Sequence, residues 1–201
     1  MKSNFNEGKI GNGLRFFTTP SKPEVLPTIN ETILKAEREI WGLKDHERII
    51  IFDDDGRVIA RKDGGEDYVQ VGDLLHKMKN RTYTHNHPYG WKFPKGNVRH
   101  MGNSFSINDV LVAIRGDAKE LRVVTPVNTF IMRRPADGWP PIEQLIFEFK
   151  STETEVYHYL YSWLELGYDN RIAKAEILHL HLIWKRVAKQ LGISYTKKSS
   201  I

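Results

Sequence analysis

The chain has 201 residues, of which 40% are hydrophobic and 27% are charged, as in ordinary globular domains. This composition excludes a wholly disordered chain, and the length suits one domain, or one small domain with an appendage. The 30 basic and 25 acidic side chains leave a net charge of +5, which permits contact with nucleic acid but does not argue for it. Because there is no cysteine, any metal ion must be held by histidine and carboxylate.

Neither a membrane segment nor a secretion signal is expected. There is no run of about 18 apolar residues, the minimum for a membrane-spanning helix. The N-terminal stretch MKSNFNEGKIGNGLRFF lacks the apolar core of a Sec-type signal peptide. We therefore expect a cytoplasmic protein with no membrane partner, while association with a virion and non-classical export stay open.

The chain divides into four predicted regions. Residues 1–30 are rich in Gly, Asn, Pro, Ser and Thr and predict an N-terminal arm or linker. Residues 31–140 alternate helix and strand patterns, which predicts an α/β or α+β domain. Residues 141–192 are helical throughout, and the polar tail over 193–201 is expected to be disordered.

Within the middle region, the turn residues and apolar patterns predict a regular series of short elements. In chain order these are a helix from an N-cap at Asn30 to Gly42, a buried strand over 47–52, a hairpin turn at Asp53–Gly56, a strand over 57–60, a strand over 68–71, a helix over 72–79, a strand over 81–87, a helix over 107–115, and strands over 120–125 and 128–132. The three aspartates of the hairpin turn lack the spacing of an EF-hand calcium loop.

Two histidines at the end of a predicted strand are the candidate metal ligands. His85 and His87 are two residues apart, so a strand presents both on the same face. Ser106 caps the helix over 107–115 and places Asp109 in its first turn, where the carboxylate can face the strand end. Two histidines and one carboxylate form a catalytic zinc set whose fourth position is left for water.

A water molecule activated in this way needs a general base to accept its proton. Glu47 opens the buried strand over 47–52 and is the best-placed acidic residue upstream of the histidines. Glu37, Glu39 and Glu66 are the alternatives.

Together these residues resemble the signature of the JAB/JAMM (MPN+) metallopeptidases. The matching elements are His-x-His-Pro at 85–88, Ser-x-x-Asp at 106–109 and a glutamate at the start of an upstream strand. The similarity covers about residues 31–134. The Asn-His-Pro segment is similar to the bacterial RadC-like branch, and also to domains attached to phage head proteins and secreted toxins.

The resemblance implies a JAB/JAMM-like mixed sheet flanked by helices, here followed by a C-terminal helical hairpin. It implies that His85, His87 and Asp109 bind Zn²⁺ and that Glu47 is the general acid/base. Ser106 would hydrogen-bond the oxyanion, with Ser104 as a second candidate for that role. The implied activity is zinc-dependent hydrolysis of a peptide or isopeptide bond in a protein or peptide substrate.

One segment departs from the family pattern. Seventeen residues separate Pro88 from Ser106, more than in typical members, and the extra segment over 89–103 contains aromatic and basic side chains. Loops on a rigid scaffold often carry specificity, so this insertion is either a flap over the substrate or a tolerated surface loop.

The C-terminal region predicts two helices that end near Leu166 and at Gly192. Tyr157, Leu160, Tyr161 and Leu164 form an apolar stripe at helical spacing, which favours packing against the domain or against a second copy in a homo-oligomer. His179 and His181 repeat the spacing of the metal candidates, but in a helix they lie on different faces and are not expected to bind one ion together.

Two other functions stay open at this stage. One is a non-catalytic binding or assembly module of the same fold, associated with a phage or a toxin. The other is a nuclease effector, which the mild basicity of the chain permits.

Overall fold

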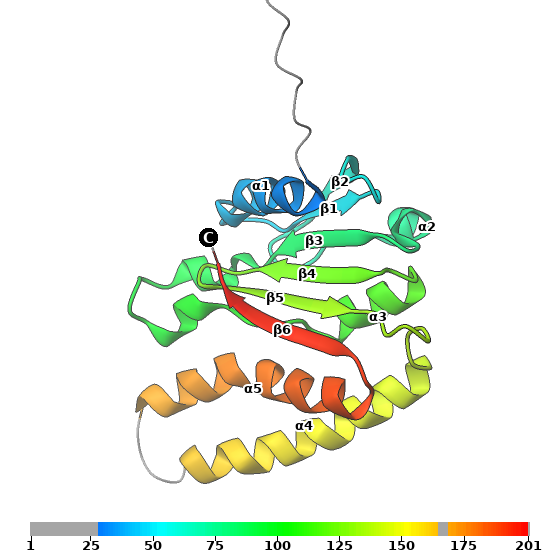
Figure 1. Ribbon diagram of the computed structural model, residues 1–201. Coiled ribbons are helices and arrows are strands. Elements are labelled where there is room, and N and C mark those ends of the chain that lie inside the picture. Colours follow the sequence, from blue (N-terminus) through cyan, green and yellow to red (C-terminus); the bar gives the residue numbers. More distant parts are fainter. Residues whose placement is uncertain (1–27, 165–168, 201) are drawn as a thin grey trace, which may run out of the picture.

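The protein has a mixed α/β fold built on a six-stranded sheet (Figure 1). The structure is a computed structural model, and it describes residues 28–164 and 169–200, so nearly all of the predicted N-terminal arm lies outside the described residues. The strands are β1 (Arg48–Phe52), β2 (Val58–Asp63), β3 (Thr82–Asn86), β4 (Glu120–Val124), β5 (Asn128–Arg133) and β6 (Ser194–Ser199). Their order across the sheet is β2-β1-β3-β4-β5-β6, and β3 and β4 form the parallel pair among antiparallel neighbours.

The helices of the described part are α1 (Ile29–Trp41), α2 (Leu75–Met78), α3 (Ile107–Arg115), α4 (Ile142–Leu164) and α5 (Asp169–Gln190). Three 3₁₀ helices are η1 (Gly72–Leu74), η2 (Pro88–Lys92) and η3 (Val98–Met101). None of the helices in these two ranges is both long and apolar enough to cross a lipid bilayer.

The alternation of side chains along the strands divides the core between the two faces of the sheet. In β1, Ile50 and Phe52 pack with α1, whereas Ile49 and Ile51 belong to the larger core on the opposite face. That larger core also contains buried side chains of α3, α4 and α5. The period of two residues therefore decides which layer each strand residue meets.

Most of the predicted elements are present, and the hairpin turn at Asp53–Gly56 joins β1 to β2 as expected. The predicted cap of α1 was wrong by two residues. Thr28, not Asn30, is the N-cap, because its side chain accepts a hydrogen bond from the Glu31 N–H while the Glu31 carboxylate accepts one from the Thr28 N–H. This capping box satisfies two N–H groups that Asn30 cannot reach from within the first turn.

The strand predicted over 68–71 is absent. The Gly65 N–H donates to the Tyr68 carbonyl and closes a turn, and Tyr68 itself is exposed. Val69 and Val71 are partly buried against the larger core without joining the sheet. Their β-branched side chains fit a pleated surface, but packing against the core satisfies the same preference.

The polar tail was predicted to be disordered, and this was wrong. Residues 194–199 form β6, which pairs antiparallel with β5 from Asn128↔Ser199 to Arg133↔Ser194 and completes one edge of the sheet. Edge strands are often rich in lysine, which discourages pairing with other chains, so a polar composition is compatible with a strand in this position.

The C-terminal helices pack against the domain and against each other (Figure 1). The buried residues of α4 recur every three or four positions: Leu145, Phe149, Thr152, Val156 and Leu160. The predicted stripe was therefore only partly right, because Leu160 is buried whereas Tyr157 and Tyr161 are each 59% exposed. Leu164 lies where side chains are not described.

Candidate metal centre

The register between β1 and β3 determines which residues meet at the site. Ile49 of β1 is paired with His85 of β3 in an antiparallel ladder. Two residues further along each chain, in opposite directions, this register brings Glu47 across from His87. Since Glu47, Ile49, His85 and His87 follow the same alternation, all four side chains point to the face covered by α3.

Helix α3 supplies the third group. Ser106 is the N-cap of α3, and its hydroxyl oxygen accepts from the Asp109 N–H at 3.2 Å. In return, the Asp109 Oδ2 atom accepts from the Ser106 N–H at 2.7 Å and from its hydroxyl at 2.9 Å. The capping box thus fixes the Asp109 carboxylate at the helix start, in the position that the sequence predicts.

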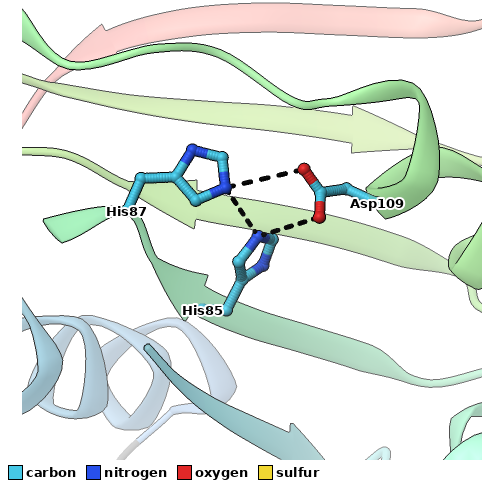
Figure 2. A group of neighbouring side chains, drawn as sticks. All are labelled: His85, His87 and Asp109. Atoms are coloured by element: carbon cyan, nitrogen blue, oxygen red, sulfur yellow. Dashed lines mark hydrogen bonds and ion pairs between the residues drawn. The ribbon is translucent and has the colours of Figure 1, made fainter. Parts of the chain in front are cut away.

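His85, His87 and Asp109 point toward one another (Figure 2). The two Nε2 atoms are 3.2 Å apart. Asp109 Oδ1 lies 3.6 Å from His85 Nε2, and Asp109 Oδ2 lies 3.5 Å from His87 Nε2. Within the described ranges, these three form a group of side chains that can hold one metal ion.

The spacing of these atoms suits a small tetrahedral ion. Zinc binds histidine nitrogen and carboxylate oxygen at about 2.0–2.2 Å, so two ligand atoms on a tetrahedron are about 3.3–3.5 Å apart. The three measured separations of 3.2, 3.5 and 3.6 Å are close to that range. The donor set and its dimensions therefore fit a metal ion.

The two histidine rings differ in the hydrogen bonds that orient them toward a metal ion. His87 Nδ1 lies 3.1 Å from the backbone carbonyl of Asn103, to which it donates as the N–H tautomer, leaving the Nε2 lone pair free for a ligand. His85 Nδ1 is buried and has no hydrogen-bond partner in the described part of the chain.

The electrostatics of the group favour a bound cation. Burial alone would lower the pKa of His87, but the hydrogen bond to Asp109 and its charge outweigh burial and raise the pKa to about 9. Burial likewise acts to raise the pKa of Asp109, yet its contacts with His85 and His87 hold that pKa well below its ordinary value. The carboxylate is thus charged and draws positive charge, either a proton or a metal ion, into the space between the rings.

Glu47 lies beside this group. Its Oε1 atom is 4.0 Å from His87 Nε2, and the residue is only 7% exposed. Burial raises its pKa, and the two histidines oppose that shift more weakly. A carboxylate with a raised pKa is a better proton acceptor than a solvated one, as general base chemistry requires.

The three alternative candidates for the general base lie away from the metal group or form ion pairs with other residues. Glu37 is on the α1 face of the sheet, where Arg122 donates to both of its oxygens at 2.6 and 3.1 Å. Glu39 is paired with Arg48 and Arg61. Glu66 does line the cleft that contains Glu47, but it forms an ion pair with Lys92.

The two serines are both engaged in hydrogen bonds. The Ser106 hydroxyl is part of the α3 cap, so binding an oxyanion would require it to release the Asp109 carboxylate. Ser104 is fully buried, with its hydroxyl 2.7 Å from the Tyr195 hydroxyl, which in turn lies 2.9 Å from His181 Nδ1.

The insertion is folded and packed. Trp91 contacts the edge of Trp41 at the end of α1 and donates its indole N–H to the Trp41 carbonyl at 3.1 Å. His100 is buried, with Nδ1 2.9 Å from the Phe93 carbonyl. Arg99 of η3 forms an ion pair with Glu176 of α5. These contacts exclude a tolerated surface loop with no packing role.

A cleft of about 250 Å³ opens beside the metal group. Its lining includes Glu47, His87 and Asp109, the alternative base Glu66, and Tyr89 and Asn103 of the insertion, together with two residues that the sequence did not single out, Asp67 and Leu180. Asn103 meets His87 through a backbone carbonyl, which every residue type has, so no sequence signal identifies that contact.

This chain matches no protein family, no curated protein and no solved structure in the comparisons made. The chemistry of the site must therefore be argued from its own residues. His179 and His181 behave as the helical spacing predicts: His179 Nδ1 contacts the Glu176 carbonyl and His181 faces Tyr195, and the two are not part of the metal-binding group found among the described residues.

Proposed function

We propose that this chain is a zinc-dependent hydrolase of the JAB/JAMM type that cleaves a peptide or isopeptide bond. The observation that carries the proposal is the near-tetrahedral spacing of His85, His87 and Asp109 with the buried Glu47 carboxylate beside it. Two histidines and one carboxylate leave a fourth position for water, as catalytic zinc sites do.

Each residue of the site has a distinct part in this chemistry. A zinc ion held by His85, His87 and Asp109 supplies Lewis acidity, which lowers the pKa of water to about 7. Glu47 accepts the proton of the attacking water and returns it to the leaving amine, which becomes a neutral amine as the carbonyl carbon gains the hydroxyl. The Asn103 carbonyl holds His87 in the tautomer that a metal ion needs.

The charge of the cleft favours an amide substrate over a nucleic acid. Among the described residues, four carboxylates line it, from Glu47, Glu66, Asp67 and Asp109, and the nearby Lys92 is already paired with Glu66. Such a wall repels phosphate groups, whereas a neutral peptide bond meets no such barrier. The sequence resemblance to JAB/JAMM metallopeptidases is the reason for proposing a peptide or isopeptide bond, and not another amide, as the bond that is cleaved.

The test combines metal analysis with hydrolysis. Protein purified without a histidine tag should contain about one zinc per chain and should cleave members of a degenerate peptide library or of a lysine-linked isopeptide library, as read by mass spectrometry. Glu47→Gln should keep the zinc and lose about 10²–10⁴-fold in rate, because an amide cannot accept the proton. Glu39→Gln is the matched control, since Glu39 lies outside the cleft and should leave the rate unchanged.

Each result separates the alternatives. Zinc-free wild-type protein would contradict the proposal and favour a non-catalytic binding or assembly module. Full activity of Glu47→Gln would move the base to another group, with Glu66 as the remaining glutamate on the cleft wall. Loss of zinc in Glu47→Gln would make Glu47 a ligand or a folding residue.

A further inference from the structure

A second, larger cavity lies next to the cleft. It has a volume of about 430 Å³, within the range of about 300–1,000 Å³ that is typical of ligand pockets. It lies between the α4–α5 pair and the segment that carries η2 and η3, and Arg99 and Glu176 join that segment to α5. The side chains that matter for its character are Tyr89, Asn103, Tyr157, Tyr161, Ile172 and His179.

The cavity borders the candidate catalytic cleft. Tyr89 and Asn103 line both spaces. Tyr89 follows the ligand candidate His87 by two residues, and the Asn103 carbonyl accepts the hydrogen bond from His87 Nδ1. A peptide whose scissile bond lies at the metal group can therefore extend into the larger cavity.

The walls of the larger cavity are mainly apolar and neutral. Tyr157 and Tyr161 are each 59% exposed and Ile172 is 49% exposed, an unfavourable state for large apolar side chains gathered at one place. Among the lining residues that the structure describes, Glu176 is the one carboxylate, and it is paired with Arg99. The described walls thus offer burial to an apolar group and little attraction to an ionic one.

We propose that the larger cavity is the specificity pocket of this enzyme and receives a large apolar side chain, aromatic or aliphatic, of a peptide substrate. The inference rests on the proposed function, whose substrate class it narrows. Polypeptides with such a residue near the scissile bond are then preferred over those with small or charged residues there.

Binding to the pocket can be tested without turnover. In protein with ¹³C-labelled isoleucine methyl groups, N-acetylphenylalaninamide should shift the signals of the pocket residues Ile172 and Ile177 with weak, roughly millimolar, saturation. The signal of Ile146, on α4 but outside the pocket lining, is the internal control, and N-acetylglycinamide should shift none of the three. Unchanged Ile172 and Ile177 signals would overturn the proposal, whatever the activity of the protein.

Selectivity provides the second test. Tyr157→Ser/Ile172→Ser removes two exposed walls, so the fold and the zinc content should be retained. Relative to peptides with alanine at the preferred position, cleavage of library peptides with Phe, Tyr, Leu or Trp there should fall about 10–200-fold. Phe147→Ser, at an exposed site of α4 outside the pocket, should behave as wild type. If the double variant keeps the wild-type preference, the proposed pocket is contradicted. If the wild-type protein cleaves no peptide, the proposed function is contradicted, and the isoleucine methyl signals still test whether the pocket binds an apolar side chain.

Discussion

His85 and His87 alternate along β3 with Thr84 and Asn86, and the two pairs serve opposite faces of the sheet. Asn86 donates to the carbonyls of Leu43 and His46 and accepts from the Arg48 N–H at 2.8 Å. These bonds tie the end of β3 to the segment between α1 and β1. Asn86 thus holds the end of the strand on one face, while the two histidines meet Asp109 on the other face.

Removal of either ligand type should abolish metal binding. In His87→Ala and in Asp109→Asn we expect the zinc content to fall from about one per chain to near zero, because two ligand groups do not hold zinc against solvent. Elemental analysis of tag-free protein measures this. His179→Gln is the control, since His179 contacts the Glu176 carbonyl away from the metal group, and zinc loss in that variant would contradict the assignment of the ligands.

The residues of the candidate site differ in how far sequence could locate them. The histidine pair and the Ser106–Asp109 cap are local patterns, with periods of two residues and one helical turn, and both were predicted correctly in position. The position of Glu47 opposite His87 depends on the β1–β3 register, which is a long-range pairing. Its place at the start of a buried strand pointed to Glu47, and the family resemblance agreed, but spacing along the chain alone does not show that Glu37 lies on the other face.

Among the elements, the insertion over 89–103 is the one for which the sequence leaves two alternatives, a flap over the substrate or a tolerated surface loop. In the structure η2 and η3 pack between α1 and α5 through Trp91 and Arg99, and the flap stays a prediction. Tyr89 lies at the start of the insertion and lines both cavities. The segment therefore has a folding role and lies beside the path that we propose for the substrate.

Trp91→Ala should reduce the stability of the protein. Trp91 is partly buried, so we expect a loss of about 2 kcal/mol, below the roughly 3–5 kcal/mol of a fully buried tryptophan. Urea unfolding measures the change. Lys92→Ala, one residue further on and exposed, is the control, since surface ion pairs such as Lys92–Glu66 contribute about 1 kcal/mol or less. Equal midpoints for both variants would show that the insertion does not contribute to the core.

The strand β6 provides a contrast between composition and context. Its polar sequence predicted disorder, yet Tyr195 stacks on Phe130 with ring centroids 6.3 Å apart and bonds to Ser104. Alternating apolar and polar residues identify a strand with one apolar face. An edge strand such as β6, which packs on the core mainly through one aromatic side chain, lacks that alternation. The remaining strands, four of them buried and β2 partly exposed at the other edge, were all recognised in outline.

Tyr195→Ala should therefore destabilise the protein by about 2 kcal/mol, since an aromatic contact and two hydrogen bonds are lost. Lys198→Ala, on the exposed part of β6, should change the free energy of unfolding by less than about 0.5 kcal/mol. Denaturant titrations of both variants measure the difference. If the segment were disordered, the two substitutions would be equally silent.

For the molecule as a whole, the contact between α5 and the sheet introduces a dependence of stability on pH. Burial, and then the charges of Lys197 and Lys185, lower the pKa of His181 to about 4. An unfolded histidine has a pKa of about 6.5. Between these values the unfolded chain binds a proton that folded His181 does not bind, so stability that is present above pH 6.5 is lost as the pH falls toward 4.

His181→Gln should flatten this dependence. We expect a smaller difference in the free energy of unfolding between pH 7 and pH 5 than in wild type, because glutamine does not titrate. His158→Gln, an exposed histidine of α4, should leave the wild-type difference unchanged. The metal group titrates equally in all three proteins, so comparing them isolates His181. If His181→Gln keeps the full wild-type difference in the free energy of unfolding between pH 7 and pH 5, other groups cause the loss of stability in acid.

The C-terminal helices α4 and α5 pack on the larger core of the sheet. Trp184 of α5 donates its indole N–H to the Phe105 carbonyl, and Phe149 of α4 packs on Trp184. The helices thus complete the core of the sheet domain. Assembly into a homo-oligomer through their outer faces stays a prediction.

The distance along the chain between Ser104 and Tyr195 has a consequence for biosynthesis. The ribosome makes the candidate metal ligands early, but the loop before α3 is held by Trp184 and by Tyr195, which follows Ser104 by 91 residues. At about 5–20 residues per second, roughly 5–18 s pass between the translation of Ser104 and that of Tyr195. During that interval the loop beside the histidine pair lacks its anchor, so a metal ion bound at the proposed site would be acquired after translation of β6.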